Sequence, residues 1–177
     1  MREYVNPWDY APHILKIINN GILLTTKADG EVDTMAIGWG TMGVQWKKPI
    51  FIAFVRQSRH TKSLLDKNPE FTINVPLDAI DKDVLRVTGT MSGRDIDKIK
   101  ELGLTLVPGE TVSVPAIKEL PLTLECKVIY QQDQDLSLLE QPSIDRCYKP
   151  GTKDETDFHT AYYGQITAAY ILKDDEE

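Results

Sequence analysis

The segment that most restricts the fold is residues 22–40, ILLTTKADGEVDTMAIGWG. Two stretches rich in apolar and β-branched residues flank Asp29-Gly30, a pair that favours the two-residue turn of a β-hairpin. Because so short a turn reverses the chain, the two strands must pair antiparallel. The sequence therefore predicts an antiparallel sheet, not a parallel sheet built from strands and crossover helices.

The rest of the chain fits the same prediction. Further strands are expected at residues 49–55, 70–76, 121–132 and 161–172, where β-branched and aromatic residues are frequent. Helices are expected at residues 8–19, 61–69, 77–90 and 92–105, with Gly21 ending the first. Since these helices are inserted between strand pairs and do not alternate with single strands, we expect a mainly β fold closed into an antiparallel barrel. The length of 177 residues suits a single domain, residues 1–177.

Composition excludes several classes of partner. A net charge of -7 argues against nucleic-acid binding, which needs a basic face. No apolar run approaches the ~20 residues of a membrane span, and residues 1–13 lack the features of a signal peptide. We therefore expect a cytoplasmic protein. Cys126 is expected to be a reduced thiol in a buried strand, whereas Cys147 lies in a polar region and could be reactive. His13, His60 and His159 are far apart in sequence, and no metal site is expected.

The stretch GWGTMG, Gly38 to Gly43, matches the dinucleotide-binding pattern G-x-G-x-x-G. That pattern binds a pyrophosphate only when a helix follows it, and here Pro49 and a strand-like run follow instead. We reject a Rossmann fold. The glycines could instead let a planar ligand approach the backbone, or they could belong to a bulged strand with a surface tryptophan.

The stretch VRQSRHT, at the end of the strand expected at residues 49–55, concentrates cationic and hydroxyl donors in an acidic protein. Arginine forms bidentate hydrogen bonds to phosphate, and backbone N–H groups at the start of a helix favour anions. If Thr61 or a neighbour caps the next helix, these groups would converge on one phosphate. The alternative is a solvated loop with an ordinary helix cap.

Several stretches together resemble one family. Residues 33–65, DTMAIGWGTMGVQWKKPIFIAFVRQSRHTKSLL, are similar to the FMN-binding split-barrel flavin reductases, in particular the flavoredoxin-like branch. FTINVP, residues 92–128 from SGRDIDKIKELG to LTLECKV, and FHTAYYGQI resemble the same branch. The resemblance implies a six-stranded antiparallel split β-barrel with added helices, a homodimer, and FMN near the dimer interface.

The resemblance also implies which residues bind FMN. The isoalloxazine ring would lie along a main-chain segment made of Met35, Ala36, Ile37, Gly38 and Trp39. The phosphate would be bound by Arg56, Ser58, Arg59, His60 and Thr61. Lys98 and the SGR stretch at residues 92–94 fall in the family's helical insertion, near the flavin in some members. Many flavin reductases have Gly-Asp-His before the last strand, with the His facing the nicotinamide; the corresponding run here is Asp157-Phe158-His159.

Three functions follow as hypotheses. The first is an NAD(P)H:flavin oxidoreductase, with His159 shaping the nicotinamide site. The second is a flavoredoxin-like electron carrier that accepts electrons from a redox protein partner without direct use of NAD(P)H, which the Phe158 substitution in the triplet would allow. The third is a split-barrel binding module without flavin. In the first two, the flavin supplies the redox chemistry and the protein binds and orients it.

Overall fold

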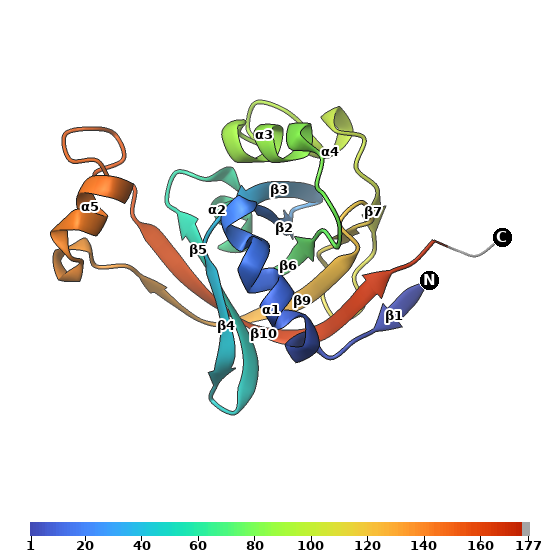
Figure 1. The fold of residues 1–177 in the computed structure, drawn as a ribbon. Helices are drawn as coiled ribbons and strands as arrows, with labels where there is room; N and C mark the ends of the chain where they lie inside the picture. Colours follow the sequence, from blue (N-terminus) through green and yellow to red (C-terminus); the bar gives the residue numbers. More distant parts are fainter. Residues whose placement is uncertain (175–177) are drawn as a thin grey trace.

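A computed structural model describes residues 1–174 of the chain, and antiparallel strands account for most of its regular secondary structure (Figure 1). One sheet contains β1 (Arg2–Tyr4), β2 (Ile22–Ala28), β3 (Glu31–Ile37), β4 (Gly40–Gln45), β5 (Lys48–Arg56), β6 (Glu70–Val75), β9 (Leu122–Asp133) and β10 (His159–Leu172). A small second sheet pairs β7 (Leu106–Val107) with β8 (Ala116–Ile117). The helices are α1 (Pro7–Ile17), α2 (His60–Leu65), α3 (Lys82–Thr90), α4 (Lys98–Glu101) and α5 (Gln141–Cys147), with 3-10 turns at Ile18–Asn20 and Leu136–Leu138.

The large sheet runs in the order β3-β2-β6-β9-β10-β5-β4, with β1 added alongside β10. Every pairing in it is antiparallel. The six strands that run in the order β3, β2, β6, β9, β10 and β5 correspond to the expected split barrel. Strand β4 extends the sheet next to β5, and β1 pairs with β10. The mainly β, antiparallel fold expected from the sequence is confirmed.

The β2–β3 hairpin forms as the sequence predicts. Asp29 and Gly30 both have positive φ, 52° and 83°, as the favoured hairpin turn requires. The register pairs Leu24 with Met35, and both side chains are buried. After Gly38 the chain enters β4, which pairs with β5, so no helix follows the glycine-rich stretch and the rejection of a Rossmann fold is confirmed.

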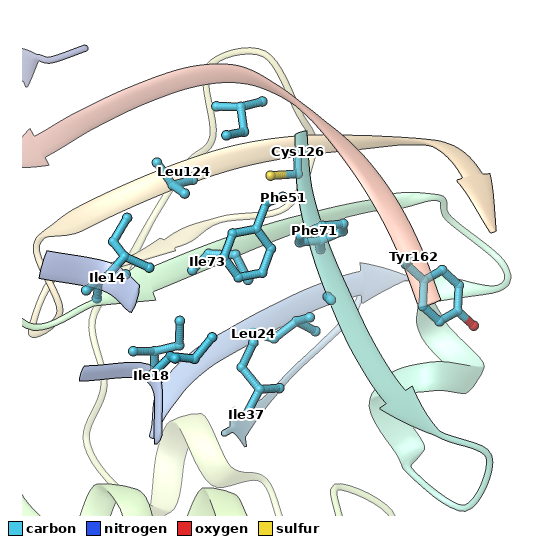
Figure 2. Close-up of a cluster of buried hydrophobic side chains, with 14 of the residues drawn as sticks. Ile14, Ile18, Leu24, Ile37, Phe51, Phe71, Ile73, Leu124, Cys126 and Tyr162 are labelled. Atoms are coloured by element: carbon cyan, nitrogen blue, oxygen red, sulfur yellow. The ribbon is translucent and has the colours of Figure 1, made fainter. Parts of the chain in front are cut away.

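The core lies between α1 and the inner face of the sheet. Figure 2 shows Ile14 and Ile18 of the N-terminal helical segment directed toward Phe51, Leu24 and Ile37. Tyr162 lies at the end of the core away from α1, and Phe71 lies between Tyr162 and Phe51; the rings of Phe71 and Tyr162 are almost fully buried.

Gly164 in β10 makes a close approach that no other residue would allow. A Cβ there would come within 2.5 Å of the Phe71 ring. The register of β10 against β9 shifts between Tyr163 and Gly164, so this position combines a bulge with tight packing.

Three expected helices are shorter than predicted, and one of them, expected at residues 61–69, spans only His60–Leu65. The helix expected at residues 77–90 begins only at Lys82, because the Asp81 side chain accepts a hydrogen bond from the Asp83 N–H and caps it there. The helix expected at residues 92–105 is reduced to the single turn α4, capped by Asp97. Thr61 was expected as a possible cap of α2; the cap residue is Arg59, and its side chain makes no capping hydrogen bond.

Residues 134–158 join β9 to β10 and contain α5; we call them the arm. Figure 1 shows the arm projecting from the barrel at one end of these two long strands. No helix formed by residues 1–174 is long and apolar enough to cross a membrane.

Candidate flavin site

A cavity of about 160 Å³ lies where β3 ends and the chain turns into β4. Its walls are Met35, Ala36, Ile37, Gly38, Trp39, Phe54, Arg56, Arg59 and His159. Met35 and Ile37 point into the core, whereas the Trp39 side chain is 40% exposed. The segment expected to lie along a planar ring therefore shares one cavity with two of the expected phosphate-binding arginines and with His159.

Strand pairing explains why residues so distant in sequence meet here. Arg56 is the last residue of β5 and pairs directly with His159, the first residue of β10. Arg59 follows as the cap residue of α2. The ends of two neighbouring strands and the start of a helix thus bring positive charge to the edge of the cavity.

Arg56 is held by the arm. Its guanidinium donates to the carbonyl oxygens of Cys147 at 2.7 Å and Asp157 at 3.3 Å, and it lies 5.3 Å from the centroid of the Tyr148 ring. These contacts fix the guanidinium between barrel and arm. They also mean that any movement of the arm changes what Arg56 can bind.

A carboxylate of the chain itself lies among the expected phosphate donors. Asp157 accepts hydrogen bonds from the Ser58 N–H at 2.8 Å and from the Ser58 hydroxyl at 2.7 Å, and its other contact is an ion pair with Arg56 at 3.8 Å. We call Arg56 and Ser58 with this carboxylate the Asp157 clasp. An oxyanion occupies the position, so the local donor set fits the oxygens of a phosphate.

Three expected residues lie elsewhere, along β3. His60 contacts the Glu31 carboxylate at 2.6 Å. The Thr61 hydroxyl donates to Asp33 at 2.9 Å, and Lys98 forms a buried ion pair with the same carboxylate at 2.9 Å. Lys98 lines a separate cavity of about 380 Å³ beside Asp33, and the side chains of His60 and Thr61 serve to attach α2 to β3.

His159 is neutral in this environment. Burial, followed by the positive charge of Arg56, lowers its pKa to about 4. Its ring lies 4.6 Å from the Trp39 ring at an interplanar angle of 35°, and its Nδ1 shares a hydrogen bond of 2.7 Å with the Tyr148 hydroxyl. The His159 side chain is buried, although it lies at the first residue of β10.

Sequence reasoning missed three residues around the cavity. Phe54 lines it from β5. Tyr148 and Asp157 reach the site from the arm. Arg94, in the SGR stretch that the resemblance places near the flavin in some members, donates to the Ser58 carbonyl at 3.1 Å and adds a third guanidinium near the donor stretch. The alternation of β5 could have identified Phe54; the arm has no periodic pattern that would have placed Tyr148.

The fold is a mainly antiparallel split barrel, and one cavity at its edge brings the segment of residues 35–39 together with Arg56 and Arg59. Residues 16–177 match the family described as flavin reductase like domain, so the chain belongs to the flavin reductase-like family. Solved members of this family bind FMN.

Individual proteins show the same relationship. A flavoredoxin from Methanosarcina acetivorans is 27% identical with a TM-score of 0.64, and the match covers 86% of this chain and 68% of that one. Flavoredoxin from Desulfovibrio vulgaris (Miyazaki F) is 26% identical with a TM-score of 0.63, covering 88% and 72%. An uncharacterised protein from Archaeoglobus fulgidus is 43% identical over 75 residues, which is 42% of either chain; the match thus covers less than two thirds of that relative.

Proposed function

We propose that this protein binds FMN and acts as an oxidoreductase, most directly an NAD(P)H:flavin oxidoreductase. The isoalloxazine would lie along the main chain of residues 35–39, and the phosphate would take the position of the Asp157 carboxylate, between Arg56 and Ser58. The observation that carries this proposal is the Asp157 clasp, an oxyanion bound at the edge of the cavity where the ring would end.

The phosphate and Asp157 compete in this proposal. Arg56 and Ser58 already bind a carboxylate, and a phosphate dianion offers more charge and more acceptor oxygens. Arg59 and Arg94 would supplement them, whereas Thr61 and Lys98 stay with Asp33. Binding of FMN would therefore release the Asp157 carboxylate from Ser58 and Arg56, while the hydrogen bond from Arg56 to the Cys147 carbonyl still holds the arm against the barrel.

The chemistry of hydride and electron transfer would come from the bound isoalloxazine. The protein would orient the ring between Trp39 and the β3 backbone and would place the guanidiniums of Arg56 and Arg59 nearby, which favours a negatively charged ring. His159 is neutral at physiological pH and can offer a hydrogen bond without a charge.

Titration of the purified protein with FMN and with riboflavin tests the binding step. We expect FMN to bind more tightly, because only FMN carries the phosphate. Equal affinities for the two flavins would contradict the proposed phosphate site. If neither flavin binds, the protein is better described as a binding module without flavin.

A second candidate is a flavoredoxin-like carrier that takes electrons from a redox protein partner, and the two flavoredoxin structures at 27% and 26% identity favour it. Anaerobic addition of NADH or NADPH to the FMN-loaded protein separates the two. Rapid bleaching of the flavin supports the reductase, and absence of bleaching supports the carrier.

We also propose that two copies associate with FMN near their interface. Exposed aromatic side chains on the barrel support this: Trp46 packs edge-on against Tyr130 at 5.6 Å, and the two side chains are 50% and 43% exposed. Light scattering on the FMN-loaded protein should give the mass of a dimer, and a monomer at micromolar concentration would contradict it.

A further inference from the structure

A second cavity, of about 490 Å³, lies where the arm folds back against the barrel; we call it the arm cavity. Trp39, Phe54 and Tyr163 form its barrel side, and Leu136 and Tyr148 are among the residues that close it from the arm. Such a mixture of aromatic and aliphatic walls with a few polar groups is typical of sites for small organic molecules.

The arm cavity adjoins the smaller cavity of the candidate flavin site, which we call the flavin cavity. Trp39 and Phe54 line both cavities. His159 links them as well, because its ring packs on Trp39 and its Nδ1 is hydrogen-bonded to the hydroxyl of Tyr148. A molecule in the arm cavity would therefore lie next to a ring bound along residues 35–39.

The charges that face the arm cavity restrict its ligand. Asp133 and Asp135 line it, whereas none of its lining residues within the described chain is a lysine or an arginine. Both carboxylates are held in place, Asp133 by the Thr160 hydroxyl at 2.5 Å and Asp135 by the Ser137 N–H at 2.9 Å. An anion in this cavity would meet two fixed negative charges, which disfavours a nucleotide pyrophosphate.

The uncharged polar groups indicate what the ligand carries. The side-chain amides of Gln132 and Gln134 can donate to a carbonyl oxygen, and the two carboxylates can accept from a hydroxyl group. We propose that the arm cavity binds an uncharged aromatic molecule with hydroxyl and carbonyl groups. That this molecule is the flavin's reaction partner rests on the proposed function.

A pair of ligands matched in shape tests the proposal. In a W8F/W46F variant Trp39 is the remaining tryptophan, and its fluorescence reports occupancy of either adjoining cavity. The variant, without added flavin, is titrated with 4-hydroxybenzamide and with 4-hydroxybenzoate at pH 7. We expect the neutral amide to bind about tenfold more tightly than the anion.

A second variant locates the binding. Asp133 and Asp135 line the arm cavity and not the flavin cavity. D133N/D135N keeps an acceptor oxygen at each position and removes both charges, so the preference for the amide should fall to about threefold or less. Failure of the amide to bind, equal affinity for both ligands, or an unchanged preference in D133N/D135N would each overturn the proposal.

FMN titration of the same protein distinguishes the two proposals. If FMN binds and the amide does not, the arm cavity assignment is wrong and the proposed function stands. If the amide binds with the expected preference and FMN does not bind, the assignment of an uncharged aromatic ligand to the arm cavity is supported and the proposed function is wrong.

Discussion

Two carboxylates of this protein are each bound by backbone N–H and hydroxyl groups, one of them fully buried and the other partly exposed. Glu125 in β9 accepts from the N–H groups of Glu110 and Thr111 and from the hydroxyls of Thr111 and Tyr170, and it is fully buried. Asp157 at the end of the arm accepts from Ser58 and pairs with Arg56, and its side chain is 15% exposed.

The difference separates a structural anion from an exchangeable one. Burial alone would raise the pKa of Glu125, but hydrogen bonds, led by that of the Thr111 hydroxyl, outweigh it and leave the pKa below its ordinary value. Its donors belong to the barrel and the loop before β8. Asp157 instead sits on a segment outside the barrel, beside the flavin cavity. The first carboxylate has no competitor, and the second occupies a position that a ligand's anion could take.

The largest expected effect is on the structural carboxylate. Glu125→Ala leaves buried donors without an acceptor, which should lower the free energy of unfolding by about 3–5 kcal/mol. Urea denaturation followed by circular dichroism measures it. Glu119→Ala is the matched control, because Glu119 also accepts from a backbone N–H, that of Thr105, but is exposed, and its loss should cost less than about 1 kcal/mol. If both variants lose a similar free energy of unfolding, Glu125 is not a specially important structural carboxylate.

The next effect concerns ligand binding at the exchangeable site. Arg59→Ala should weaken FMN by about 1.5–3 kcal/mol, the range for a charge-assisted hydrogen bond, and leave riboflavin nearly unchanged. Arg59→Ala with Arg56→Ala should weaken FMN further. Fluorescence titration with both flavins gives the comparison. If the two flavins weaken to the same degree, the arginines hold the ring or the fold and not the phosphate.

A third effect depends on pH and tests the junction of arm and barrel. The pKa of His159 is about 4 in the folded chain, below its ordinary value of 6.5, so between these values the unfolded chain binds a proton that the folded chain does not. Stability is therefore lost as pH falls through this window, by about 1–2 kcal/mol between pH 7 and pH 5. The His159→Gln variant lacks the titrating group. Between pH 7 and pH 5 its free energy of unfolding, measured by urea denaturation, should therefore fall by about 1–2 kcal/mol less than that of the unmodified protein. Parallel pH profiles for the two proteins would show that His159 is accessible to solvent.

The sequence predicts the barrel better than the site, for a physical reason. Asp29-Gly30 and the apolar and β-branched residues of β2 and β3 express local backbone preferences, which a sequence displays directly. The donor stretch was also recognisable, and an oxyanion does contact Arg56 and Ser58. The sequence could not show that this oxyanion is Asp157, because the Ser58–Asp157 contact joins residues 99 positions apart.

The same limit applies to the residues found along β3. Lys98 and Thr61 have side chains that could bind a phosphate, but the sequence does not show that both bind the Asp33 carboxylate instead. A buried ion pair such as Lys98 with Asp33 is decided by packing between elements. Composition therefore indicates which donors exist, and tertiary contacts decide which of them stay available.

The smallest expected effect tests competition at the Asp157 clasp itself. Asp157→Asn keeps an oxygen that can accept from the Ser58 N–H and removes the charge that pairs with Arg56. A phosphate would then displace a weaker occupant, so FMN should bind about threefold to tenfold more tightly, equivalent to about 1 kcal/mol, while riboflavin stays unchanged. Glu31→Gln is the matched control, since Glu31 contacts His60 in the same donor stretch but does not line the flavin cavity. Weaker FMN binding in Asp157→Asn would mean that Asp157 orients the donors for the phosphate, and the exchangeable carboxylate would then be as structural as Glu125.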